Sequence, residues 1–160
     1  MKKIIIGVLI LLVSAHSFGQ GKNPPAKKFQ LGIGIGTGIY SNDGTAFATS
    51  AELQGESRLS PGISIFSTLA YNRLFGDGGS AGYASLLAGP RVWFTDHFFI
   101  GFGGGIAFAA GDGASSTAFN YNPHMGVDTK KAQFSLGYNA ISEEGDNVGF
   151  IQAKAIFKLK

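Results

Sequence analysis

From residue 29 onward, apolar side chains occupy every second position in one segment after another. Eight such segments are separated by short stretches rich in Gly, Asp, Ser, Thr and Lys, and they span residues 29–40, 46–58, 62–73, 82–94, 98–109, 118–128, 132–141 and 148–159. A period of two places successive side chains on opposite faces of a strand, whereas a helix requires a period of 3.6. The pattern therefore predicts an all-β chain with essentially no helix after residue 28. An even number of strands this long predicts an eight-stranded antiparallel up-and-down transmembrane β-barrel.

The two faces of each segment differ in character. Segment 29–40 carries Leu31, Ile33 and Ile35 on one face and places glycine on much of the other. Glycine makes up 25 of the 160 residues, and glycines on the inner wall of a narrow barrel leave room for larger side chains opposite. The apolar face is therefore expected to point outward. Pro90 removes one ladder hydrogen bond from segment 82–94, and we expect a β-bulge there.

The first 28 residues differ from the rest of the chain. Residues 1–19 combine Lys2 and Lys3, a short apolar run, and small residues at 17 and 19, which together predict a signal peptide. The apolar run is about half as long as the roughly 20 residues that a membrane-spanning helix needs. Residues 20–28 are polar and contain two prolines, which is typical of a flexible periplasmic leader. Residues 29–160 then form the barrel domain.

Composition excludes several classes of function. The chain has no cysteine, which excludes disulfides, thiolate metal sites and lipoprotein attachment. Of its 13 basic residues two belong to the signal peptide, which leaves 11 against 10 acidic ones. A nearly neutral chain gives no electrostatic reason to expect nucleic acid as a partner.

The connections between segments alternate in length. Those after the second, fourth and sixth segments are tight, and the others are looser and rich in Gly, Asp and Ser. Short periplasmic turns opposite longer external loops are typical of outer-membrane barrels. Aromatic residues near the segment ends are expected to form two lipid-facing girdles at the membrane interfaces. The girdle residues are Phe29, Phe94, Phe98 and Phe157 on the periplasmic side and Phe47, Tyr71, Phe108, Phe119 and Tyr138 on the outer side.

Charged residues on the inward faces require partners, because eight strands enclose only enough space for side chains and an unpaired charge there is costly. The predicted lumen charge cluster consists of Glu52, Glu56, Arg91, Lys154 and Lys158. We expect the two glutamates to pair with Lys154 and Arg91 as a structural plug. A gated ion path through the same residues is the alternative.

The stretches 89–94 and 98–105 resemble the small outer-membrane β-barrel family of Gram-negative bacteria, the porin-family or outer membrane protein β-barrel domain proteins. Residues 134–139 and the last strand, ending at Lys160, resemble the closing hairpin of that family. The resemblance covers essentially the whole mature chain and implies a location in the cell outer membrane. Family members commonly end on an aromatic residue that the barrel-assembly machinery reads, whereas here Phe157 is three residues from the end.

No catalytic, cofactor or metal site is predicted. His124 lies on an inward face, but Met125 and Gly126 follow it, so the His-x-Ser pattern of the lipid A deacylases is missing. No nucleophile and base pair is visible, and the glycines at 32, 34 and 36 lie within a strand pattern rather than in a dinucleotide loop.

The sequence therefore predicts a non-enzymatic outer-membrane protein with a structural or interaction role and a lumen filled by side chains. Its expected partners are outer-membrane lipid, the barrel-assembly machinery during insertion, and another envelope protein. A narrow porin-like channel for ions or small solutes is the first alternative. The second is a soluble periplasmic lipocalin-like barrel, which would place apolar side chains inside and polar ones outside.

Overall fold

The computed structural model describes residues 29–41, 45–76, 79–110, 117–143 and 146–159. The described residues form eight strands: β1 (Phe29–Ser41), β2 (Thr45–Ser60), β3 (Ile63–Gly76), β4 (Gly79–Trp93), β5 (Phe98–Ala110), β6 (Thr117–Asp128), β7 (Ala132–Glu143) and β8 (Asp146–Lys158). The predicted signal peptide at 1–19 and the leader at 20–28 lie outside the described residues. Within the described part, no helix is long and apolar enough to cross a membrane.

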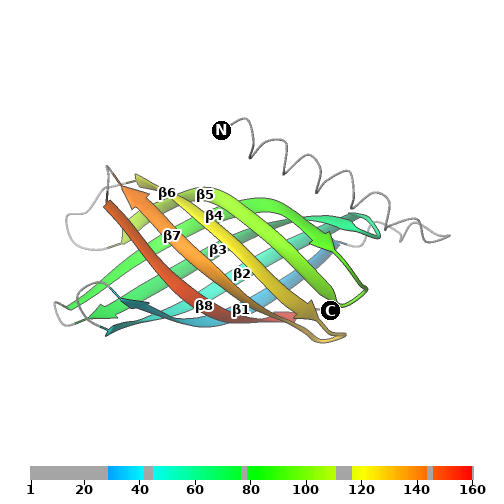
Figure 1. Cartoon of the computed structure of the whole chain (residues 1–160), viewed down its shortest axis with the longest axis horizontal. Helices are drawn as coiled ribbons and strands as arrows, with labels where there is room; N and C mark the ends of the chain where they lie inside the picture. Colours follow the sequence, from blue (N-terminus) through cyan, green and yellow to red (C-terminus); the bar gives the residue numbers. More distant parts are fainter. Residues whose placement is uncertain (1–28, 42–44, 77–78, 111–116, 144–145, 160) are drawn as a thin grey trace.

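Each strand pairs antiparallel with the next, and β8 pairs with β1 to close the barrel (Figure 1). The predicted fold class is therefore confirmed. Several strands extend beyond the alternating pattern, as in the hairpin where Gly76 pairs with Gly79. Gly79 has a φ of 120°, which glycine adopts readily and other residues rarely do. The sequence pattern ends earlier than the strands because backbone pairing needs a partner strand rather than a particular side chain.

The β-bulge that we expected at Pro90 is not found. Pro90 pairs with Ile65 of β3, and the ladder with β5 keeps one register from Ala88↔Gly104 to Arg91↔Gly101. Proline removes one N–H donor without adding a residue, so the ladder loses a bond and resumes in phase. The register shift between β2 and β3 lies instead between Arg58 and Ser60, next to the turn.

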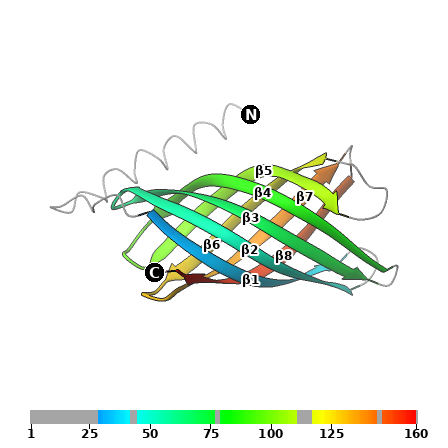
Figure 2. The ribbon, with the colours of Figure 1, turned by 180° about the vertical axis from the view of Figure 1, so that it is seen from behind.

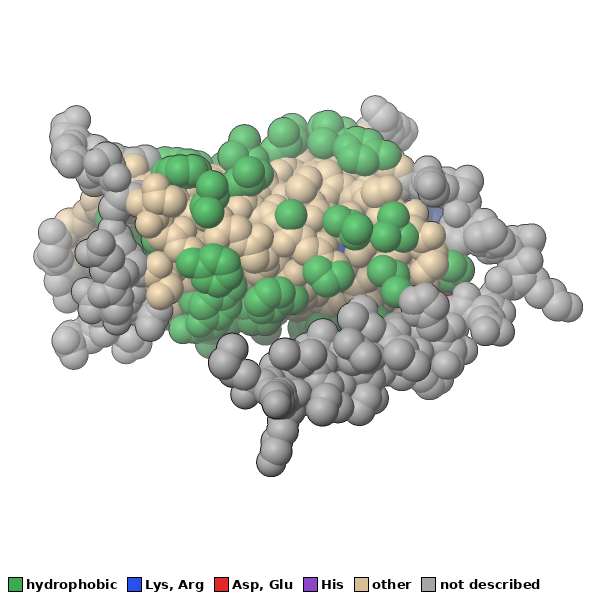
Figure 3. All heavy atoms as spheres, turned by 90° about the horizontal axis from the view of Figure 1, so that it is seen from above, with side chains coloured by type: hydrophobic (Ala, Val, Ile, Leu, Met, Phe, Trp, Pro, Cys, Tyr) green, Lys and Arg blue, Asp and Glu red, His purple; other side chains and the backbone are tan. Residues whose placement is uncertain are grey.

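The outward and inward faces follow the predicted alternation, except near the two ends of β7, where Ala132 and Ala140 on the outward face are also buried. Large apolar side chains cover the outside, including Ile35 (62% exposed), Leu69 (55%) and Leu136 (54%). Figure 3 shows such side chains spread over the barrel wall. The alternate side chains are buried in the lumen, and about half of them are polar or charged. The exposed wall is thus apolar while the interior holds many polar groups, unlike a soluble protein.

The start of β1 and the end of β8 lie at the same end of the barrel, which we call the turn end (Figure 2). At this end, tight turns join β2 to β3, β4 to β5 and β6 to β7. The start of β1 and the end of β8 meet there, where the Leu159 N–H donates to the Leu31 carbonyl over 2.8 Å. The residues that join strands at the opposite, loop end lie outside the described ranges, apart from the strand ends themselves.

Candidate functional site

The lumen is filled in layers, and the layer nearest the loop end is apolar. Seven buried side chains form this apolar layer: Ala48, Leu74, Tyr83, Ala107, Ala118, Ile141 and Phe150. The strand register places them around one circumference, since Ala48 pairs with Leu74 and Ala107 pairs with Ala118. Phe150 is only 1% exposed, and Tyr83, the other aromatic residue of the layer, is 8% exposed. This layer fills the lumen with packed apolar side chains near the loop end.

A polar layer lies directly beneath the apolar layer. It consists of the buried side chains of Ser50, Asn72, Ser85, Asn120, Asn139 and Gln152. Gln152 donates to Ser50 over 2.8 Å, and Asn72 donates to Ser85 over 3.3 Å. Ser50 and Asn72 are also directly paired across β2 and β3, and Asn139 is diagonal to Gln152 across β7 and β8. We call this ring the amide layer.

Arg91 on β4 organises the next part of the lumen. Its guanidinium donates to one Glu56 oxygen over 2.6 Å, to the Gln133 side-chain oxygen over 3.0 Å and to that of Gln54 over 2.8 Å. The same group lies 4.3 Å from the ring centroid of Phe66 and 4.6 Å from that of Phe99, which are cation–π distances. Both charged side chains are nearly inaccessible, at 3% and 5% exposure. Arg91 is therefore paired, hydrogen-bonded and enclosed by two aromatic rings.

His124 on β6 completes the environment of Arg91. Its Nδ1 lies 3.0 Å from the Asn122 carbonyl oxygen, which can only accept, so Nδ1 carries the proton. Nε2 accepts a hydrogen bond from Arg91 Nε over 3.1 Å. Both ring nitrogens are thus occupied in a neutral imidazole, and no described nucleophile is bonded to either of them.

The other inward charges also lie in pairs. Lys154 donates to Glu52 over 2.9 Å between β8 and β2. Lys158 lies closer to the turn end and pairs with Asp128 at 2.7 Å, a partner that sequence analysis did not assign to it. The structure thus brings the five residues of the predicted cluster into three separate ion pairs rather than one group.

Sequence reasoning missed most of what surrounds Arg91. The alternation places Gln54 and Gln133 on the inward faces of their segments and Phe99 opposite the outward residues of its own, but it does not indicate that they meet around Arg91. Gln133 donates to Glu56 over 2.9 Å, and Gln54 donates to Gln133 over 2.9 Å. These contacts join residues 77 and 79 positions apart in the chain. The only indication of them in the sequence is that each residue belongs to the inward face of its segment.

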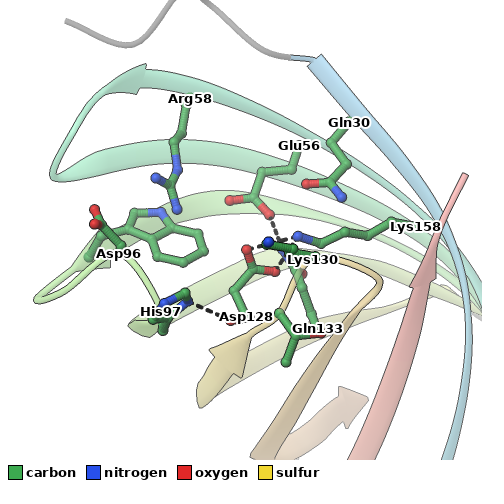
Figure 4. A pocket seen from close by; sticks show the side chains of 11 residues that line it. Gln30, Glu56, Arg58, Asp96, His97, Asp128, Lys130, Gln133 and Lys158 are labelled. Carbon is green, nitrogen blue, oxygen red and sulfur yellow. Dashed lines mark hydrogen bonds and ion pairs between the residues drawn. The ribbon is translucent and has the colours of Figure 1, made fainter. Parts of the chain in front are cut away.

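At the turn end the lumen widens into a cavity of about 460 Å³, which we call the turn-side vestibule. Figure 4 shows side chains from several strands and turns converging on it. The charged residues of its lining are Glu56, Arg58, Asp96, Asp128, Lys130 and Lys158. The guanidinium carbon of Arg58 lies over the ring of Trp93, 3.8 Å from its centroid. A cavity around Arg91, deeper in the lumen, measures only about 10 Å³.

The nine predicted girdle aromatics lie on the outer wall. Phe98 is half-buried, and the other eight are exposed. Near the turn end the rings of Phe94 and Phe98 are in tilted contact, with centroids 6.0 Å apart, and near the loop end those of Phe47 and Phe75 are in tilted contact at 6.4 Å. Their role at membrane interfaces stays a prediction. Among the described residues, no three His, Asp or Glu side chains lie close enough to hold a metal ion.

The architecture defines a class: small, closed, up-and-down β-barrels of eight strands with an apolar outer wall and a lumen filled by polar and apolar side chains. The chain is similar to the Yersinia pestis outer membrane protein Ail in a phospholipid bilayer nanodisc, with 13% identity, a TM-score of 0.58, and 84% of this chain and 100% of that chain covered. It is also similar to Ail in its crystal structure, with 16% identity, a TM-score of 0.55, and coverage of 83% and 99%. A de novo designed transmembrane β-barrel gives 8% identity, a TM-score of 0.54, and coverage of 81% and 95%. No family model and no curated protein matches the sequence. At these identities the likeness concerns the fold.

Proposed function

We propose that this chain is an integral protein of the cell outer membrane, with a structural or interaction role and no enzymatic activity. It is exported by its signal peptide and inserted by the barrel-assembly machinery. Outer-membrane lipid surrounds its wall, and its ends are available to another envelope protein. The similarity of the fold to outer-membrane barrels supports this location.

The exposed apolar wall around a polar lumen is the observation that carries the proposal. Side chains such as Ile33, Leu86 and Ile151 are 50–61% exposed, while Glu52, Gln54 and Asn72 are 5% exposed or less. Water would not support such a wall, whereas hydrocarbon does, because lipid removes apolar surface from water. A soluble lipocalin-like barrel requires the opposite arrangement.

The filling of the lumen supports a structural role over a channel. The cavity beside Arg91 is large enough for about one water molecule, and the apolar layer separates it from the loop end. A hydrated ion would have to displace both the Arg91 hydrogen bonds and the apolar side chains above them.

Membrane integration is tested by fractionating cells that express the chain. We expect the protein in the outer-membrane fraction, extractable only with detergent, with faster gel migration before boiling than after. Extraction by buffer alone would contradict the proposal.

Conduction is tested separately, in planar lipid bilayers containing the refolded protein. Because the lumen is filled, we expect no steady conductance from the unmodified protein. The double variant Phe150→Ala/Leu74→Ala should admit water to the amide layer without opening the region around Arg91. Steady single-channel currents from the unmodified protein would favour the channel alternative.

A further inference from the structure

We propose that the turn-side vestibule binds a carboxylate, with Arg58 and Lys130 as its two cationic contacts. The proposal adds a ligand site to the barrel. It holds whichever end of the barrel faces outward, and it does not require that the barrel lie in a membrane.

Arg58 is held in place for such a role. Its guanidinium makes a cation–π contact with Trp93. The Trp93 indole N–H donates to Ser64 Oγ over 2.8 Å, and Ser64 donates to Glu56 over 2.6 Å. Trp93 is only 6% exposed, so the platform under Arg58 is fixed by the lumen itself. The side chain of Arg58 donates no hydrogen bond to another described residue, so its N–H groups are available to a ligand. A planar fork of N–H groups matches a carboxylate in two-point hydrogen bonding. Because the side chain is ordered beforehand, binding costs less conformational entropy.

The charge balance of the vestibule favours an anion. Glu56 is paired with Arg91, and Asp128 with Lys158, so these four charges are internally compensated. Among the described residues, Arg58, Lys130 and Asp96 have no ion pair. Two uncompensated cations therefore face one uncompensated anion, and the excess of one positive charge matches a single carboxylate.

The size and access of the vestibule fit a small ligand group. Its volume of about 460 Å³ lies within the range of ordinary ligand sites. Since the lumen beyond it is filled, a ligand enters and leaves from the turn end. The carboxylate can belong to a free small molecule or to the end of a peptide, and the two sources share the same contacts.

Trp93 provides the measurement, because it is the one tryptophan in the chain and supports Arg58. The full-length protein in detergent micelles is titrated at constant ionic strength with propionate, with N-acetyl-alanyl-alanine and with the C-terminal amide of that dipeptide. We expect a saturable change in Trp93 fluorescence with both carboxylates and none with the amide. Tighter binding of the dipeptide identifies a peptide end as the source, and equal binding identifies a free carboxylate. An equal response to the amide, or no saturation with any probe, overturns the proposal.

Variants that remove either a positive or a negative charge from the vestibule distinguish a contact with the ligand from a structural effect. Arg58→Gln should weaken binding about tenfold or more, because a hydrogen bond to a charged group is lost. Arg58→Lys should recover part of the loss. Asp96→Asn should strengthen binding roughly 2–5-fold, because an exposed opposing charge is removed.

Lys131→Gln is the control matched to Lys130→Gln, since both lysines lie in the same turn but only Lys130 lines the vestibule. Folding of each variant is verified by its gel mobility before boiling. Unchanged binding in well-folded Arg58→Gln would also overturn the proposal.

Discussion

Arg91 shows how a charge is tolerated inside a barrel this narrow. Its guanidinium donates four hydrogen bonds and lies between two phenylalanine rings. Breaking a buried ion pair by removing one partner is costly mainly because the other charge remains unpaired. The side chain that depends most on Arg91 is Glu56, which is 4% exposed.

We therefore predict that Arg91→Met lowers the free energy of unfolding by about 3–5 kcal/mol. The double variant Arg91→Met/Glu56→Gln should be more stable than Arg91→Met alone, because no unpaired carboxylate remains. Chemical denaturation in lipid vesicles, followed by Trp93 fluorescence, measures both. Equal stabilities of the single and double variants would show that the ion pair is not the source of the loss.

Among the strands, β5 shows how glycine serves the two faces differently. A Cβ added at Gly105, which faces inward, would collide with the Leu86 carbonyl oxygen of β4. A Cβ added at Gly104, which faces outward, would meet its nearest atoms at 3.8 and 3.9 Å, in ordinary contact with the rings of Phe102 and Phe119. The close approach of β4 and β5 thus requires glycine at 105 and not at 104.

Gly105→Ala is accordingly expected to destabilise the barrel or to slow its refolding, since backbone atoms must shift. Gly104→Ala should be neutral or slightly stabilising, because alanine is less flexible in the unfolded chain than glycine. The fraction that migrates as the folded form on an unboiled gel compares the two variants. Similar losses in both would contradict the assigned difference between the faces.

For the whole molecule, the continuous apolar wall decides where the protein can be stable. Leu69 lies at the middle of β3, paired with Leu53 and Leu86 on the neighbouring strands, at mid-height of this wall. Phe94 is similarly exposed but borders the tight turn that precedes β5.

If lipid covers the wall, Leu69→Arg should cost about 2–4 kcal/mol and Phe94→Arg about 0–1 kcal/mol, because the cost of a charge falls from the membrane midplane to its interface. Reversible unfolding from vesicles measures both values. Equal costs at the two positions would argue against a membrane centred on Leu69.

The sequence by itself determined the number of strands, the pairing order and the phase of every strand except β4 near Pro90. Alternation is a local property of an extended chain, so Glu52 and His124 could be assigned inward from their neighbours alone. The inward placement of Arg91, next to Pro90, was decided by the structure, which buries its side chain. The tertiary structure alone decided which inward side chains meet. The offset between successive strands around the closed barrel places Arg91 of β4 against Gln133 of β7 and assigns Lys158 to Asp128. It also stacks the apolar layer over the amide layer and opens the vestibule beneath Arg58. That offset depends on backbone pairing and barrel closure, which the alternation within one strand does not encode.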